Sequence, residues 1–243
     1  MSGRERELDD IEAEAHGHQH RDVSGGWLRP TVFGAMDGLV SNMSLVSGVA
    51  AGGGSRTFIV LSGVAGLVGG AGSMAAGEYI SVQSQNELVA AEVDKERREL
   101  RRDPEGEQEE LAALYEARGL SPTLATQVAA ALSTDPEITL QVHAREELGV
   151  DPRSLPSPWS AAALSFVSFV VGAAIPLLPY LFGSSSLLLA FVLAGLALFG
   201  GGAVVGHITA RSPVYAGSRQ LLVGALSAAV TYGIGAAIGV TLT

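Results

Sequence analysis

The sequence predicts an all-α, polytopic membrane protein with five transmembrane helices and a polar helical domain inserted between the second and third. Five segments are apolar for about 20 residues, the length that a helix needs to cross a hydrocarbon core about 30 Å thick. Only 16% of the 243 residues are charged and 31 are glycine, a composition that favours lipid-facing helices over a soluble domain. Most of the charge lies in one segment, residues 84–158.

The chain divides into four parts along its length. Residues 1–26 are polar and have no apolar core, so we expect a disordered cytosolic tail rather than a signal peptide. Residues 84–158 form the insert. The two flanking parts, 27–83 and 159–243, hold the transmembrane helices, which we expect at 30–53, 57–82, 159–182, 186–209 and 217–242.

The insert is predicted to be a small, acidic helical bundle. Its sequence contains sixteen Asp and Glu residues against eight Lys and Arg. Breaks are expected where Asp or Ser precedes Pro, at Asp103-Pro104, Ser121-Pro122 and Asp135-Pro136. These breaks predict helices at 84–102, continuing out of the second span, and then at 105–118, 122–133 and 136–148.

The distribution of Lys and Arg in the loops predicts the orientation of the chain. With the N-terminus in the cytosol, the insert also lies there, and Arg56 is the only one of the 15 Lys and Arg residues on the far side. The C-terminus then lies outside. Because the sequence shows no targeting peptide, we expect the protein in the cell (inner) membrane as a multi-pass protein.

The composition also limits the chemistry. The chain has no cysteine, so disulfides and thiolate metal sites are excluded, and any metal must be held by oxygen, imidazole or thioether ligands. The net charge of −10 and the lack of a basic stripe argue against a nucleic-acid partner.

Acidic side chains in the insert recur at spacings that place them on one face of a helix. Three pairs do so: Glu96 with Glu99, Glu107 with Glu110, and His143 with Glu147. One interpretation is a solvated acidic face relieved by neighbouring arginines. The other is a set of oxygen and imidazole ligands for divalent cations, whose charge would replace the repulsion by attraction.

Two carboxylates, Asp37 and Glu78, fall within the predicted spans. A charged side chain at the bilayer centre costs at least about 2.5 kcal/mol, so such a group is expected to face a cavity or an ion path. Both residues lie toward the cytosolic end of their span, and an interfacial position is the alternative. Met74, one helical turn before Glu78, can offer a thioether ligand or simply pack. Neutral oxygen ligands are available next to Asp37, on Ser41 and Asn42.

Histidines outside the insert have two open interpretations. His207, at the cytosolic end of the fourth span, is either an interfacial residue or a proton-transfer group. The tract HGHQH, with His16, His18 and His20, either captures metal loosely or has no dedicated role, because alternate residues in a disordered tail have no fixed geometry.

These motifs together resemble the vacuolar iron transporter family. The matching segments are GAMDGLVSNMSLVSGVAAG in the first span, GSMAAGEYISVQSQNE in the second and REELG at the end of the insert. The resemblance runs from about Trp27 to the C-terminus. It implies a homodimer of five-span protomers, with a cytosolic metal-binding domain, that carries ferrous iron (Fe2+) and related divalent ions from the cytosol across the membrane in exchange for protons.

The resemblance also implies roles for individual residues. The glutamates that match the family's metal-binding positions are Glu96, Glu99, Glu107, Glu110 and Glu147. Asp37 and Met74 match its translocation residues, and we add Glu78 as a second acid on the path. Members commonly have methionine before REELG, where this chain has His143 followed by Ala144. Imidazole also binds Fe2+ or Zn2+, so we expect a site with altered selectivity. Some members carry a further carboxylate earlier in the second span, where Gly66-Leu67-Val68 has none.

The sequence-based hypothesis is therefore a transporter of Fe2+, with Mn2+ as a second candidate substrate and Zn2+ and Co2+ as further ions that the insert can bind. It is not expected to be an enzyme, and no catalytic residue is assigned. The alternative is a membrane-anchored protein that stores or senses iron without transport, although Asp37 and Met74 would then have no purpose. A third hypothesis is a membrane-embedded ferroxidase, which would require a closed di-iron site.

Overall fold

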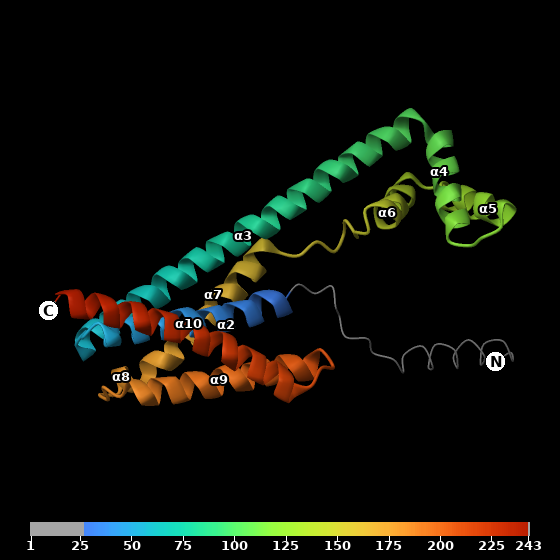
Figure 1. Cartoon of the computed structure of the whole chain (residues 1–243). Helices are drawn as coiled ribbons and strands as arrows, with labels where there is room; N and C mark the ends of the chain where they lie inside the picture. Colours follow the sequence, from blue (N-terminus) through green and yellow to red (C-terminus); the bar gives the residue numbers. More distant parts are fainter. Residues whose placement is uncertain (1–26, 243) are drawn as a thin grey trace, which may run out of the picture.

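Five long apolar helices form the main body of the protein. The computed structural model describes residues 27–242, and within that range every regular element is a helix (Figure 1). The helices long and apolar enough to span a membrane are α2 (Leu28–Ala51), α3 (Arg56–Arg102), α7 to α8 (Pro158–Leu181), α9 (Leu187–Ile208) and α10 (Pro213–Leu242). A helix of suitable length and composition is found at each of the five predicted spans, with ends displaced by a few residues, and α3 continues beyond its span through 84–102 as predicted. The predicted disordered tail and its histidine tract lie outside the described residues.

Helix α2 lies at the centre of this bundle. It contacts α3, α7, α9 and α10, and its Leu39, Met43 and Val46 are almost fully buried. Glycine brings α2 and α7 into close contact, because a methyl group added at Gly38 would overlap the backbone of Phe169. Where lipid provides no hydrophobic drive between helices, such close backbone packing is a main source of association.

Helix α7 is interrupted near its end. The regular helix Pro158–Ala174 gives way to a 3₁₀ turn, η1 (Ile175–Leu177), and then to the short α8 (Leu178–Leu181). Pro176 and Pro179 lack an N–H and so cannot continue the α-helical hydrogen bonding. The interruption lies against α2, where Asn42 Nδ2 donates a hydrogen bond of 2.6 Å to the Ala173 carbonyl.

Helix α3 carries the chain out of the bundle and into the insert. Its 47 residues extend over about 70 Å at 1.5 Å per residue, more than twice the hydrocarbon thickness. Figure 1 shows its second half projecting from the bundle, with α4 (Pro104–Ala117), α5 (Pro122–Leu132) and α6 (Pro136–Glu147) at the far end. These helices agree with the four predicted in the insert. The carboxylates of Asp103 and Asp135 cap α4 and α6, as the Asp-Pro pairs indicate.

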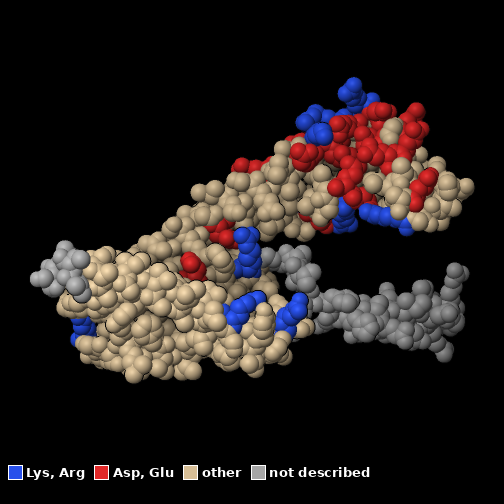
Figure 2. All heavy atoms as spheres, viewed as in Figure 1, with Lys and Arg blue, Asp and Glu red and all other residues tan. Residues whose placement is uncertain are grey.

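Charged and aromatic side chains distinguish the two regions. Acidic side chains gather on the insert in Figure 2, whereas the surface of the bundle is largely uncharged between basic groups at its two ends.

Tyr79 on α3 and Trp159 on α7 contact each other with ring centroids 4.7 Å apart. Tyr and Trp are typical of membrane–water interfaces, which suits a helix leaving the lipid near Tyr79. At the opposite end of the bundle, Arg56 Nε donates to the Tyr180 carbonyl at 2.8 Å.

Candidate metal-binding cluster and membrane groove

Three helices of the insert bring one imidazole and three carboxylates together. Glu96 comes from α3, Glu107 from α4, and His143 and Glu147 from α6, and each places one ligand atom within 4.8 Å of the others. His143 Nδ1 lies 3.0 Å from Glu96 Oε1, 3.6 Å from Glu107 Oε2 and 2.8 Å from Glu147 Oε1. We refer to these four residues as the insert cluster.

Packing between α3 and α6 positions the insert cluster. An apolar contact formed by Val93, Leu140 and Ala144 joins the two helices beside the cluster. Glu96 follows this contact on α3 and His143 lies within it on α6, so the two side chains meet. The chain turns at Asp103, whose backbone is not helical, and the first turn of α4 places Glu107 Oε2 3.6 Å from His143 Nδ1.

Burial and mutual repulsion disfavour the charged carboxylates. Glu96 is only 7% exposed, and burial, followed by the nearby charge of Glu147, raises its pKa to about 7 although His143 opposes the rise. The pKa of Glu107 is also raised, chiefly by burial. A raised carboxyl pKa means that the surroundings favour the neutral form. A divalent cation at the centre would reverse this preference and hold both groups ionised.

Hydrogen bonding does not satisfy the insert cluster. A protonated His143 Nδ1 has one proton to donate while three carboxylates face it. It pairs with Glu147 Oε1, and the buried Glu96 Oε1 has no hydrogen-bond partner among the described residues. Buried polar atoms without partners are rare in proteins. Three carboxylates and one imidazole form a donor set that suits Fe2+, Mn2+ or Zn2+.

Glu99 and Glu110 lie near the insert cluster but contribute no atom to it. The charge of Glu99 raises the pKa of both Glu96 and Glu107, and that of Glu110 raises the pKa of Glu107. Both glutamates therefore add negative potential at the site. The metal-binding role of all six residues stays a prediction.

A second set of polar side chains lies within the bundle. A groove of about 460 Å³ between α2, α3 and α7 is lined by Asp37, Ser41, Asn42, Ser73, Met74 and Phe169, among others. Asp37 and Met74 therefore share one groove, the membrane groove hereafter. Glu78, one turn beyond Met74, is half-buried and does not line it. Sequence reasoning did not identify Phe169, because an apolar run carries no signal for which side chain faces α2.

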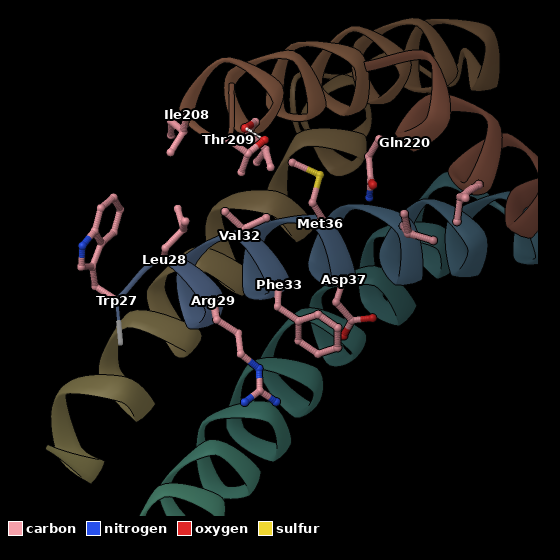
Figure 3. A pocket seen from close by; sticks show the side chains of 13 residues that line it. Trp27, Leu28, Arg29, Val32, Phe33, Met36, Asp37, Ile208, Thr209 and Gln220 are labelled. Carbon is pink, nitrogen blue, oxygen red and sulfur yellow. Dashed lines mark hydrogen bonds between the residues drawn. The ribbon is translucent and has the colours of Figure 1, made fainter. Parts of the chain in front are cut away.

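A larger hollow of about 970 Å³ lies on the other side of α2, toward α9 and α10. Figure 3 shows Leu28, Val32 and Met36 projecting toward Ile208 and Thr209, whereas Arg29, Phe33 and Asp37 project toward α3. Asp37 borders both hollows. The lining of the larger one is mostly apolar, so the polar ligands that a cation needs are concentrated in the membrane groove. His207 is exposed at the end of α9 and lines neither hollow.

The fold and these two sites define a multi-pass helical membrane protein with clustered candidate metal ligands both beside and within its bundle. The chain matches the model of the VIT family over residues 28–236, and it belongs to that family. The motif resemblance to vacuolar iron transporters is thereby confirmed, and membership supports a role in metal transport.

Similar proteins cover almost the whole chain. The vacuolar iron transporter of Acanthamoeba castellanii is 39% identical over 233 residues, which span 90% of this chain and 82% of that protein. Vacuolar iron transporter homolog 1 of Oryza sativa subsp. japonica is 33% identical over 237 residues, covering 93% and 83% of the two chains. Vacuolar iron transporter 1 of Arabidopsis thaliana is 28% identical over 223 residues, covering 89% and 88%.

Proposed function

We propose that this protein moves Fe2+ out of the cytosol across the cell membrane in exchange for protons, with Mn2+ as a second substrate. The observation that carries the proposal is that Asp37 and Met74, a carboxylate and a thioether from different helices, share one groove among the membrane spans. A protein that only stored metal on its insert would need no ligands there. The names of the similar proteins, as vacuolar iron transporters, support the same substrate.

The distribution of basic residues supports the orientation of the chain and hence transport of the metal out of the cytosol. Arg29 lies in the first turn of α2, Arg211 lies in the link between α9 and α10, and Arg219 lies in the second turn of α10. All three are on the same side of the bundle as the insert, and Arg56 lies at the opposite end. Basic residues concentrate on the cytosolic side of membrane proteins, so the insert and the N-terminus face the cytosol and the C-terminus faces outward. The acidic insert then gathers cations from the cytosol.

The two sites suggest a sequence of steps. The insert cluster captures the metal ion from cytosolic water, and α3 joins the insert to the membrane groove as one continuous helix. In the groove, Asp37 and Met74 replace water ligands of the ion. A bound dication disfavours protonation of a carboxylate, so an Asp37 that alternates between metal and proton would couple the two opposing flows. Glu78 is the second candidate for this coupling.

The exposure of the groove supports a homodimer. Asp37 is exposed in the single chain, and a methyl group at Gly69, Gly72 or Gly77 on α3 would meet no other atom within 4 Å. A carboxylate facing lipid is costly, and open small residues permit close approach of another helix. A second copy packed on this face would enclose the membrane groove between protomers.

Uptake into proteoliposomes separates transport from storage. Purified full-length protein is reconstituted, Mn2+ is added outside, and the trapped metal is released with a divalent-cation ionophore. Transport predicts ionophore-releasable Mn2+ far in excess of one equivalent per protein molecule. A storage protein would hold only its bound equivalents, and the ionophore would release no more than empty liposomes do.

A further inference from the structure

Asn42 has an amide group of which only one end is used. Its side chain is 2% exposed, and Nδ2 donates to the Ala173 carbonyl at 2.6 Å. Oδ1 is buried and has no hydrogen-bond partner among the described residues. Because a carbonyl can only accept, the nitrogen must face Ala173 and the oxygen must face away.

The interruption of α7 explains why the amide is fixed in this way. Ala173 lies in the last turn before η1, which contains Pro176. The change to 3₁₀ geometry and the missing proline N–H leave carbonyls at the end of α7 short of α-helical donors. Asn42 supplies one donor from α2, and this bond fixes the rotation of its side chain.

The free oxygen faces the membrane groove. Asn42 lines the groove together with Asp37 and Met74. A methyl group added at Gly66 on α3 would lie 3.4 Å from Oδ1, so the oxygen is directed at a helix surface that carries no side chain at that point. An unpartnered buried amide oxygen costs free energy that an ion or its water would recover.

Hydroxyls farther along α2 differ from Asn42 because they are already paired. Ser44 Oγ lies 2.9 Å from Ser227 Oγ on α10, and Ser47 Oγ lies 3.1 Å from Thr231 Oγ1 and 3.2 Å from the Ala228 carbonyl. These bonds join α2 to α10. Unlike these hydroxyls, Asn42 Oδ1 is held in place by the bond that Nδ2 makes and has no hydrogen-bond partner among the described residues.

We propose that Asn42 Oδ1 is a fixed, neutral ligand for the transported divalent ion, one step beyond Asp37 on its path. The inference rests on the transport function proposed above. Asn42 is the fifth residue after Asp37 on α2, so the two positions lie about 7.5 Å apart along the helix axis. An amide oxygen replaces a water ligand without adding charge, so the ion leaves it more readily than it leaves a carboxylate. No side chain of Gly66 covers this oxygen, and the end of the Leu45 side chain, which lies over Gly66, must move aside for the ion to reach it.

The test uses Gly66→Ala, which places a methyl group over Asn42 Oδ1. The hydrogen bond from Asn42 Nδ2 to the Ala173 carbonyl stays intact. The added methyl group lies at van der Waals distance from Oδ1, and its closer neighbour is the mobile end of Leu45. Gly200→Ala on α9 is the matched control, because it makes the same change in another membrane helix, away from the groove and from the proposed protomer contact, with nothing within 4 Å. Asn42→Leu, of similar size, removes both the oxygen and the bond to Ala173.

Mn2+ uptake by the full-length protein in proteoliposomes gives KM and kcat, and thermal melting reports the packing. Gly66→Ala is expected to raise KM on the order of tenfold with an unchanged melting temperature, as losses of oriented groups at metal sites do. Gly200→Ala should match wild type, and Asn42→Leu should lose at least as much affinity as Gly66→Ala. If wild type transports Mn2+ and Gly66→Ala keeps the wild-type KM, the inference alone is overturned. If wild type moves no Mn2+, the proposed function and this inference fail together.

Discussion

Replacing Glu96 with glutamine is expected to remove much of the pH dependence of metal binding by the insert between pH 6 and pH 8. Burial raises the pKa of Glu96 to about 7, so this carboxyl changes its protonation within that range. A metal ion binds the ionised form and must displace the proton. Glutamine keeps the size and one oxygen of the side chain but has no proton to release.

The size of the effect follows from this pKa. Glu96 holds about 0.9 proton at pH 6 and about 0.1 proton at pH 8, so its titration alone weakens apparent Mn2+ affinity about tenfold between pH 8 and pH 6. Wild type should therefore release about 0.9 proton more than Glu96→Gln on binding Mn2+ at pH 6, and nearly the same number at pH 8.

Titration calorimetry of the full-length protein in detergent measures both quantities. Each titration is repeated in two buffers of different ionisation enthalpy, which yields the number of protons released. Glu109→Gln is the control, because Glu109 is exposed on α4 and outside the insert cluster. Equal proton release by wild type and Glu96→Gln at pH 6 would refute the reasoning, and so would a Glu109→Gln variant that behaves like Glu96→Gln.

Three further predictions concern stability and the ligand set. The raised pKa of Glu96 means that the folded, metal-free protein holds the Glu96 proton more tightly than the unfolded chain does. The resulting gain in the free energy of unfolding is fully present below the ordinary pKa of 4.5 and is lost as the pH rises to about 7. Melting of the metal-free protein should thus show up to roughly 3 kcal/mol of extra stability on acidification that Glu96→Gln lacks. Mn2+ at 100 times its Kd should stabilise the insert by about 2.7 kcal/mol, and His143→Leu should weaken that binding at least about tenfold by calorimetry because it removes the central ligand. Gly38→Ala, whose methyl group would overlap the Phe169 backbone, should lower the melting temperature by several degrees, whereas Gly200→Ala should not.

The elements of the fold could be predicted from the sequence because their signals are local. Twenty apolar residues define a span wherever they occur, and an Asp-Pro pair both ends one helix and caps the next. The composition of the insert cluster was not predictable in the same way. Sequence spacing pairs Glu99 with Glu96 and Glu110 with Glu107, but the packing of α6 on α3 and the turn at Asp103 decide which carboxylates reach His143.

The membrane groove shows the same distinction. Asp37 was identified as unusual from its charge alone, and the family resemblance paired it with Met74. The part of the groove that α7 forms depends on the tertiary contact between Asn42 and Ala173, residues 131 positions apart. No periodicity or composition encodes such a contact, so Phe169 was missed and the orientation of the Asn42 amide could not be stated.

The proposed exchange of metal for protons is tested most directly by recording metal and proton movement together. Wild type and Asp37→Asn are reconstituted in proteoliposomes that contain a pH-sensitive dye, and Mn2+ uptake and internal pH are followed in the same sample. Uptake by wild type is expected to be accompanied by opposite proton flow, and Asp37→Asn is expected to abolish both. Asp37→Asn should leave Mn2+ binding by the insert cluster unchanged, because the two sites are separate. Transport of Mn2+ and protons by Asp37→Asn at wild-type rates would contradict the proposed exchange.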